Sequence, residues 1–213
     1  NALSVANSST APTFTDAGIV GTAFYSGGAA HVEVAKDDKW ADLLGRNVSL
    51  SAWVKTTLSA GTYYSRIFSC KEDHKDTPGF ELTLQDSYTN YNVIGCGNVQ
   101  NIVRGQADCN AAFVYVTAVM ENGNAQLYVN GQTAGGVKAG GYALTNSVNP
   151  LRLGRMVSGG NAWRGWLDEM RLQWAAQSVD WVAADYATQY DPVFAVLGTP
   201  EAINNYGTMI FLR

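Results

Sequence analysis

The sequence predicts an all-β protein built as an antiparallel sandwich of two sheets, and two observations carry this prediction. Short segments rich in β-branched and aromatic residues alternate with clusters of Gly, Asn, Asp and Ser, which is the pattern of strands joined by turns. Only 15% of the 213 residues are charged and 22 are glycine, whereas surface helices favour Glu, Lys, Arg and Ala. A chain of this length allows one sandwich-sized domain.

Nine segments have the strand pattern. They are Ala30–Ala35, Val48–Thr56, Arg66–Cys70, Phe80–Gln85, Tyr91–Gly95, Phe113–Glu121, Ala125–Val129, Leu151–Arg155 and Trp166–Trp174. The segment Phe113–Met120 is apolar on both faces, so we expect it in the middle of a sheet and covered on both sides. The dipeptides Asn122-Gly123 and Asn130-Gly131 favour the tight turns that match the twist of paired strands, and they predict two hairpins.

One helix is expected near the C-terminus, starting after a capping Ser178 and ending at Asp191-Pro192. Its stripe of larger side chains is expected to dock on a sheet edge. The stripe consists of Trp181, Val182, Asp185 and Tyr186.

The two ends of the chain have weaker patterns. The stretch 1–16 is rich in Ser, Thr, Asn and Pro and is predicted to be a loop. Near the C-terminus, Tyr206–Leu212 is either one more strand that pairs with a sheet edge or an unpaired tail that could add a strand to a partner. The first residues, Asn1-Ala2-Leu3, do not form a signal peptide, so we expect an excised or mature domain.

Charge and hydropathy exclude two classes of partner. The net charge is −4 and the isoelectric point about 5.1, so the basic surface of a nucleic-acid-binding protein is not expected. No apolar run approaches the roughly 18 residues of a membrane-spanning helix. The low charge and the abundance of Gly, Asn, Ser and Thr favour a secreted protein.

The three cysteines, Cys70, Cys96 and Cys109, include no CxxC pair, which argues against zinc and thioredoxin-type chemistry. Cys96 and Cys109 flank a stretch rich in Gly, Asn and Gln. Two alternatives stay open: a disulfide between these two, or three free thiols.

Four segments in order resemble the laminin-G-like, concanavalin A-like jelly-roll family. They are Gly18–Gly27 with His31–Val34, Asn47–Lys55, Val114–Val119 with Ala125–Gly131, and Leu151–Arg155 with Gly165–Leu172. The resemblance implies an antiparallel jelly-roll β-sandwich with one short C-terminal helix. It also implies a domain over residues 1–195, followed by a C-terminal tail over 196–213.

The resemblance further implies a structural calcium ion near the start of the domain. Its expected ligands are Asp168 and Gly27, with Asp16 as a third. Calcium takes six to eight hard oxygen ligands and accepts loop carbonyls, which suits such a site. The alternative is that Asp168 accepts hydrogen bonds or pairs with Arg171 or Arg164.

Carbohydrate binding is the leading functional hypothesis. Aromatic side chains set among Gly, Ser, Asn and Thr are typical of loops, where binding residues concentrate. The expected ligand-binding residues are Tyr88, Tyr91, Tyr142, Trp163 and Arg164. The alternative for each is packing at the rim of the sandwich.

The remaining tryptophans of interest, Trp53, Trp166 and Trp174, lie inside strand patterns and are expected in the core.

Catalysis is not expected. Related glucanases carry a Glu-x-Asp-x-(x)-Glu signature, and the nearest strings, Phe80–Asp86 and Leu167–Met170, do not supply it. Adjacent residues of a strand, such as Asp168 and Glu169, point to opposite faces and cannot form the carboxylate pair of a glycosidase.

The sequence thus predicts a noncatalytic, monomeric module of a larger bacterial protein, secreted or at the cell surface, that binds an oligo- or polysaccharide and contacts neighbouring domains. The alternative is a structural or adhesive module that contacts protein and binds no glycan.

Overall fold

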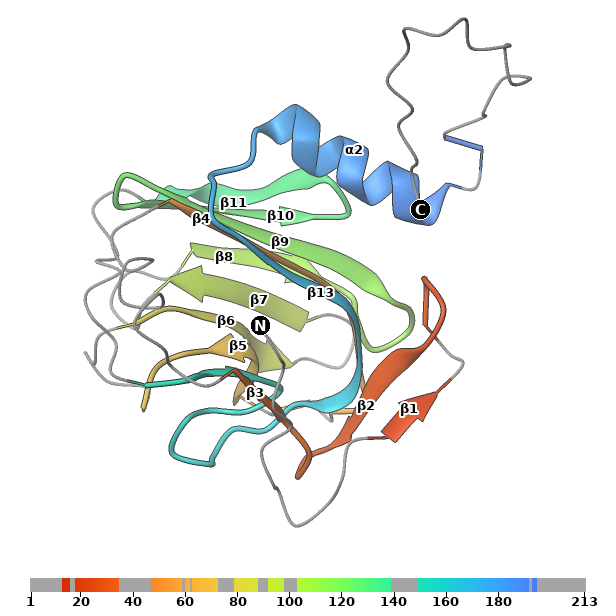
Figure 1. Ribbon diagram of the computed structural model, residues 1–213, viewed down its shortest axis with the longest axis vertical. Coiled ribbons are helices and arrows are strands. Elements are labelled where there is room, and N and C mark those ends of the chain that lie inside the picture. Colours follow the sequence, from red (N-terminus) through yellow and green to blue (C-terminus); the bar gives the residue numbers. More distant parts are fainter. Residues whose placement is uncertain are drawn as a thin grey trace, which may run out of the picture.

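The computed structural model describes residues 13–15, 18–34, 47–58, 60–61, 63–72, 79–87, 92–97, 103–138, 149–191 and 193–194. Within these residues two antiparallel sheets face each other, and one helix lies outside them (Figure 1). The predicted tail, with its possible strand Tyr206–Leu212, lies outside the described residues.

The first sheet has seven strands, and neighbouring strands are often distant in sequence. In spatial order they are β1 (Thr13–Thr15), β2 (Ala23–Gly27), β13 (Arg164–Gln173), β4 (Val48–Thr56), β9 (Val114–Glu121), β10 (Asn124–Val129) and β11 (Gln132–Lys138).

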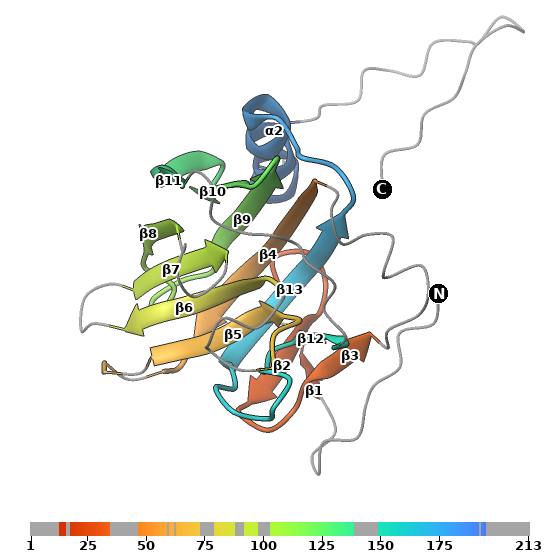
Figure 2. The ribbon, with the colours of Figure 1, turned by 90° about the vertical axis from the view of Figure 1, so that its left-hand side faces the viewer.

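The second sheet has six strands. In spatial order they are β3 (Val32–Val34), β12 (Leu151–Leu153), β5 (Tyr63–Ser69), β6 (Glu81–Ser87), β7 (Asn92–Gly97) and β8 (Val103–Ala107). All the described pairings are antiparallel. The two-sheet sandwich predicted from the sequence is therefore confirmed, and Figure 2 shows its two layers.

The core lies between the sheets and is built from alternate residues of facing strands. Leu50 and Val116 from the first sheet and Leu82 and Ile94 from the second all have no exposed surface. Strand β9 is buried on both sides up to Met120, as its two apolar faces predicted.

Both predicted hairpin turns are present. Asn122 and Gly123, between β9 and β10, have φ of 49° and 79°. Asn130 and Gly131, between β10 and β11, have φ of 49° and 74°. Two consecutive left-handed residues define the turn that Asn-Gly favours, because Gly has no Cβ and Asn tolerates this region.

The predicted helix is α2 (Val179–Tyr190), and the Ser178 hydroxyl accepts a hydrogen bond from the Trp181 N–H at 3.2 Å. Val182 is fully buried against Val119 and Tyr128. These two residues belong to β9 and β10, so the helix covers the outer face of the seven-stranded sheet and not the expected edge (Figure 2). The helix described here is too short and too polar to cross a membrane.

Four strands were not predicted: β1, β2, β8 and β11. Thr13–Thr15 was assigned to a loop because Ser, Thr and Pro surround it, and β8 lies within the stretch read as a Gly/Asn/Gln-rich loop. These segments are strands because they pair with a neighbouring strand, and strand propensity depends strongly on such context. All three cysteines are buried as thiols and not as a disulfide, and burial raises the pKa of Cys96 and of Cys109 to about 12.

Candidate functional site

A groove of about 580 Å³ opens where helix α2 ends, next to the last residues of β8 and β10 and the first of β9. We call it the aromatic groove. Its rings and polar side chains come from Trp53, Phe113, Tyr186, Tyr190, Gln106, Asp108 and Asn130.

Strand alternation places Trp53 on the outer face of the sheet, because its neighbours Ala52 and Val54 face the core. The Trp53 ring lies 5.6 Å from that of Tyr186 and 6.1 Å from that of Tyr190, measured between centroids. The two tyrosines stack on each other at 5.3 Å with an interplanar angle of 13°. Tyr190 is 61% exposed, so the stack leads from the buried Trp53 to the surface.

Polar contacts fix the last two turns of the helix against the sheet. The Trp53 Nε1–H donates to Gln189 Oε1 at 2.9 Å. The Tyr115 hydroxyl donates to Asp185, which also pairs with Arg171 at 2.6 Å. Burial and the Asp185 hydrogen bond raise the pKa of Tyr115 to about 12, so the hydroxyl keeps its proton over the physiological range. Tyr186 and Tyr190 therefore stand on a helix that is firmly anchored.

The groove combines flat apolar surfaces with a few polar groups, which is the composition of small-ligand sites. Phe113 and Tyr190 contribute aromatic rings to its lining. Asp108 and Gln106 add a carboxylate and an amide. Asn130 uses its Oδ1 to accept the Tyr115 N–H at 2.9 Å, which leaves its amide N–H groups for other acceptors. Such a groove suits a ligand with apolar C–H faces and many hydroxyl groups.

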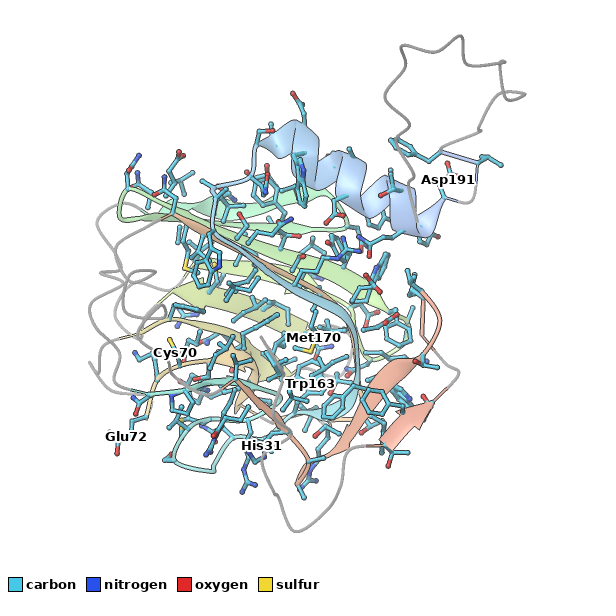
Figure 3. All side chains as sticks on the ribbon, in the orientation of Figure 1. His31, Cys70, Glu72, Trp163, Met170 and Asp191 are labelled. Carbon is cyan, nitrogen blue, oxygen red and sulfur yellow. The ribbon has the colours of Figure 1, made fainter. Side chains whose placement is uncertain are left out.

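Of the five predicted ligand-binding residues, the structure describes Trp163 and Arg164. Tyr88, Tyr91 and Tyr142 lie outside the described residues. Trp163 has no exposed surface and belongs to the core cluster (Figure 3). Its predicted role as an exposed platform is wrong, because the side chain turns inward. The main-chain N–H of Trp163 donates to the Gly154 carbonyl oxygen at 2.8 Å.

Arg164 is exposed, as predicted. It lines a second pocket of about 420 Å³, together with Ser65, Asn161 and neighbouring main chain.

The three tryptophans expected in the core also differ from expectation. Trp53 is buried, but under α2 and not between the sheets. Trp166 is half-buried on the outer face, and Trp174 is 41% exposed. A strand pattern shows which residues share a face, but it does not show what covers that face.

Asp168 accepts three main-chain hydrogen bonds. Its Oδ2 accepts from the N–H groups of Ile19 and Val20, at 2.7 and 3.0 Å, and its Oδ1 accepts from the Glu169 N–H at 2.9 Å. The side chain is only 4% exposed. The structure therefore agrees with the alternative prediction, in which Asp168 accepts hydrogen bonds.

Two of the three predicted calcium ligands, Gly27 and Asp168, are described, and they lie apart along the sheet. Gly27 lies opposite Arg164, four residues before Asp168 on β13, which corresponds to about 13 Å along an extended strand. Two ligands of one calcium ion lie within about 5 Å of each other, because each is about 2.5 Å from the ion. In the described part of the chain no three His, Cys, Asp or Glu residues cluster as metal ligands would. Asp16 lies outside it, and calcium binding stays a prediction.

The family follows from the sequence as a whole. A model of the concanavalin A-like lectin/glucanases superfamily matches residues 26–196, and the chain belongs to this superfamily. No curated protein sequence matches the chain.

Solved structures with this fold include several binding domains. Domain 4 of an extracellular arabinanase from Geobacillus stearothermophilus, in complex with arabinotriose, superposes with a TM-score of 0.64 at 17% identity, over 86% of this chain and 84% of that one. The CBM40 domain of the Ruminococcus gnavus IT-sialidase gives 0.60 at 14% identity, over 77% and 96%. The binding domain of botulinum neurotoxin serotype G gives 0.62 at 16% identity, over 85% and 45%. Identities this low show a shared fold alone.

Sequence reasoning missed most of the aromatic groove. The sequence predicts Tyr186 as part of the helix stripe that docks on the sheet, and not as a binding residue. Tyr190 follows it by one helical turn, on the same side of the helix, and this spacing was the available signal. Asp108 and Phe113 lie at the two ends of the short connection between β8 and β9. They reach the groove because this connection lies beside the end of α2, which the sequence alone does not reveal.

Proposed function

We propose that this domain is a noncatalytic module that binds carbohydrate in the aromatic groove. The observation that carries the proposal is the stack of rings ending in the exposed Tyr190, beside the polar side chains of Gln106 and Asp108. The arabinanase domain, whose structure contains arabinotriose, and the CBM40 domain share the fold and give the proposal further support.

In this proposal the module does not hydrolyse its ligand. Hydrolysis by a glycosidase needs two carboxyl groups, one on either side of the scissile bond. Of the described residues that line the groove, Asp108 alone carries a carboxylate. Glu81, in the string closest to the glucanase signature, is 1% exposed and lies 2.9 Å from Arg66 in an ion pair. It is not accessible to a substrate.

We further propose that the module acts outside the cell or at the cell surface, as a monomeric part of a larger bacterial protein. The support is the similar domain of an arabinanase that is described as extracellular. Adjacent domains of the same chain would then bring the module to its polysaccharide.

Affinity electrophoresis tests the proposal. Gels containing arabinan, xylan or β-glucan should retard the purified domain. Tyr190→Ala removes the exposed ring, and we expect about tenfold weaker binding, because a stacked aromatic contributes roughly 1 to 1.5 kcal/mol. The matched control is Phe14→Ala, which removes an equally exposed ring (63%) from the edge strand β1 and should bind like wild type.

Two results would contradict the proposal. Tyr190→Ala could bind as well as wild type, in which case the aromatic groove is not the site. The wild-type domain could also fail to bind any polysaccharide, neutral or acidic, which would favour the structural or adhesive alternative.

A further inference from the structure

A second aromatic surface lies on the outer face of the seven-stranded sheet. Tyr25, Trp166 and Lys55 stand directly opposite one another on β2, β13 and β4. The Tyr25 and Trp166 rings are 5.0 Å apart, and Lys55 Nζ lies 5.5 Å from the centre of the Trp166 ring. All three side chains are half-buried, so part of each remains accessible.

Arg164 extends this surface toward the second pocket. Along the start of β13, residues alternate between exposed and buried, which places Arg164 and Trp166 on the same outward side. The Arg164 side chain runs along the main chain of Gly28. A Cβ built on Gly28 would lie only 2.8 Å from Arg164 Nε. Gly28 also has φ of +93°, so this close approach depends on glycine. The Arg164 side chain lines the pocket of about 420 Å³ beside Ser65 and Asn161.

The described side chains of this surface include two cations, Lys55 and Arg164, although the whole chain carries −4. The ion pairs among the described residues use Arg66, Arg152 and Arg171, and none of them uses Lys55 or Arg164. The nearest carboxylate on β13 is Asp168, two residues beyond Trp166, and its oxygens are occupied by three main-chain N–H groups. Lys55 over the Trp166 ring, and Arg164 two residues from Trp166 on the same side of β13, attract an anion to this surface.

We infer that Tyr25, Trp166, Lys55 and Arg164 form an acidic-sugar site, which binds a sugar residue that bears a carboxylate. The inference rests on the proposed carbohydrate-binding function and adds a ligand class and a second site. The apolar face of the sugar lies against Trp166. Its carboxylate pairs with Arg164, whose planar guanidinium matches two carboxylate oxygens, and Lys55 adds a second positive charge.

Two matched pairs of probes test the site by titration calorimetry. The first pair is polygalacturonate and its methyl-esterified form, which share a backbone and differ in charge. The second pair is sialyllactose and lactose. We expect the charged member of at least one pair to bind about tenfold tighter, as one charge-assisted hydrogen-bond pair provides. This preference should shrink between about 50 mM and about 500 mM NaCl because salt screens exposed charges.

Substitutions then test which side chains of the protein cause the preference for the charged probe. Arg164→Gln and Lys55→Gln should each weaken binding of the charged probe by about five- to tenfold and leave binding of the uncharged probe unchanged. Arg164→Lys keeps the charge but not the planar fork, and should fall between wild type and Arg164→Gln. The control is Arg104→Gln, which removes an exposed cation from β8 on the other sheet and should change affinity by less than about twofold. Circular dichroism and melting confirm that each variant is folded.

Several outcomes overturn the acidic-sugar site while leaving the aromatic groove intact. One is equal affinity for charged and uncharged probes. Another is an equal loss in Arg104→Gln and Arg164→Gln, which shows non-specific attraction. A third is binding of polyglutamate as tight as that of the charged sugars, with the same dependence on Arg164, which shows an acidic-peptide site. Failure to bind any sugar, including the neutral polysaccharides tested on Tyr190→Ala, rejects both this site and the proposed function.

Discussion

The Asp168 side chain holds the segment between β1 and β2 against β13 by accepting hydrogen bonds from the N–H groups of Ile19 and Val20. Asp168→Asn keeps the size of the side chain but replaces an acceptor oxygen by an NH₂ group and removes the charge. We expect the free energy of unfolding to fall by about 2 kcal/mol, because a nearly buried charge-assisted acceptor is lost. Urea denaturation measures the loss. Since the partners are main-chain N–H groups, the loss should be the same in calcium and in chelator.

The control for this substitution is Glu121→Gln, which removes a carboxylate from the exposed end of β9 and should change stability by less than about 0.5 kcal/mol. A loss at Asp168 that is present in calcium and absent in chelator would show that a bound ion, and not the amides of Ile19 and Val20, is the partner.

Single residues were also where sequence reasoning failed most clearly. Trp163 and Trp166 are three positions apart, and their expected environments were exchanged: Trp163 is in the core and Trp166 faces outward. Tryptophan is both a core residue and a binding residue, so residue type does not decide between the two. Arg164 was placed correctly, because a charged side chain beside glycine and asparagine rarely becomes buried.

At the scale of elements, the link between α2 and the sheet depends on the Tyr115–Asp185 hydrogen bond. We expect Tyr115→Phe and Asp185→Asn each to lower the free energy of unfolding by about 1.5 to 2 kcal/mol. The double variant should lose about 1 kcal/mol less than the sum, because both changes break one interaction. Urea denaturation of the four proteins gives this coupling energy.

A pH series supplies a second readout for the same pair. The pKa of Tyr115 is raised from 10.0 to about 12 in the folded protein, so its protonated form stabilises the fold below pH 10. That contribution is lost as the pH rises from 10 to 12. The stability of Tyr115→Phe should therefore fall less over this window than that of wild type. Strict additivity of the two substitutions, together with parallel pH curves, would contradict a direct link.

Elements with strong local signals were predicted well. Strand β4 has the bounds that were expected, and so do the Asn-Gly hairpins and the capped helix, because each is encoded by neighbouring residues. Strands β8 and β11 were missed because their glycines weaken the local signal, although Gly105 and Gly135 are required where the two sheets approach. The aromatic groove was missed for a related reason, since it forms between the ends of elements distant in sequence.

At the scale of the whole molecule, the sandwich is closed at one side where β8, the edge of one sheet, meets β11, the edge of the other. A Cβ on Gly105 of β8 would lie 2.7 Å from the Ala134 Cβ, so the main chains meet with no room for a side chain. On β11, Gly135 has φ of +72° and a Cβ there would overlap the Arg104 carbonyl oxygen. The next residue, Gly136, has open space around its Cα, which gives a control one position away.

Gly135→Ala should therefore lower the free energy of unfolding by at least about 2 kcal/mol, from left-handed strain together with the steric overlap. Gly136→Ala should change it by less than about 0.5 kcal/mol. Urea denaturation compares the two variants, and hydrogen exchange shows where the loss acts: we expect faster exchange at β8 and β11 and little change at β4, in the middle of its sheet. Equal stability of the two variants would contradict the close approach of the two sheets at this edge.

Because the aromatic groove begins at the end of β8, Gly135→Ala should also weaken carbohydrate binding there, whereas Gly136→Ala should not.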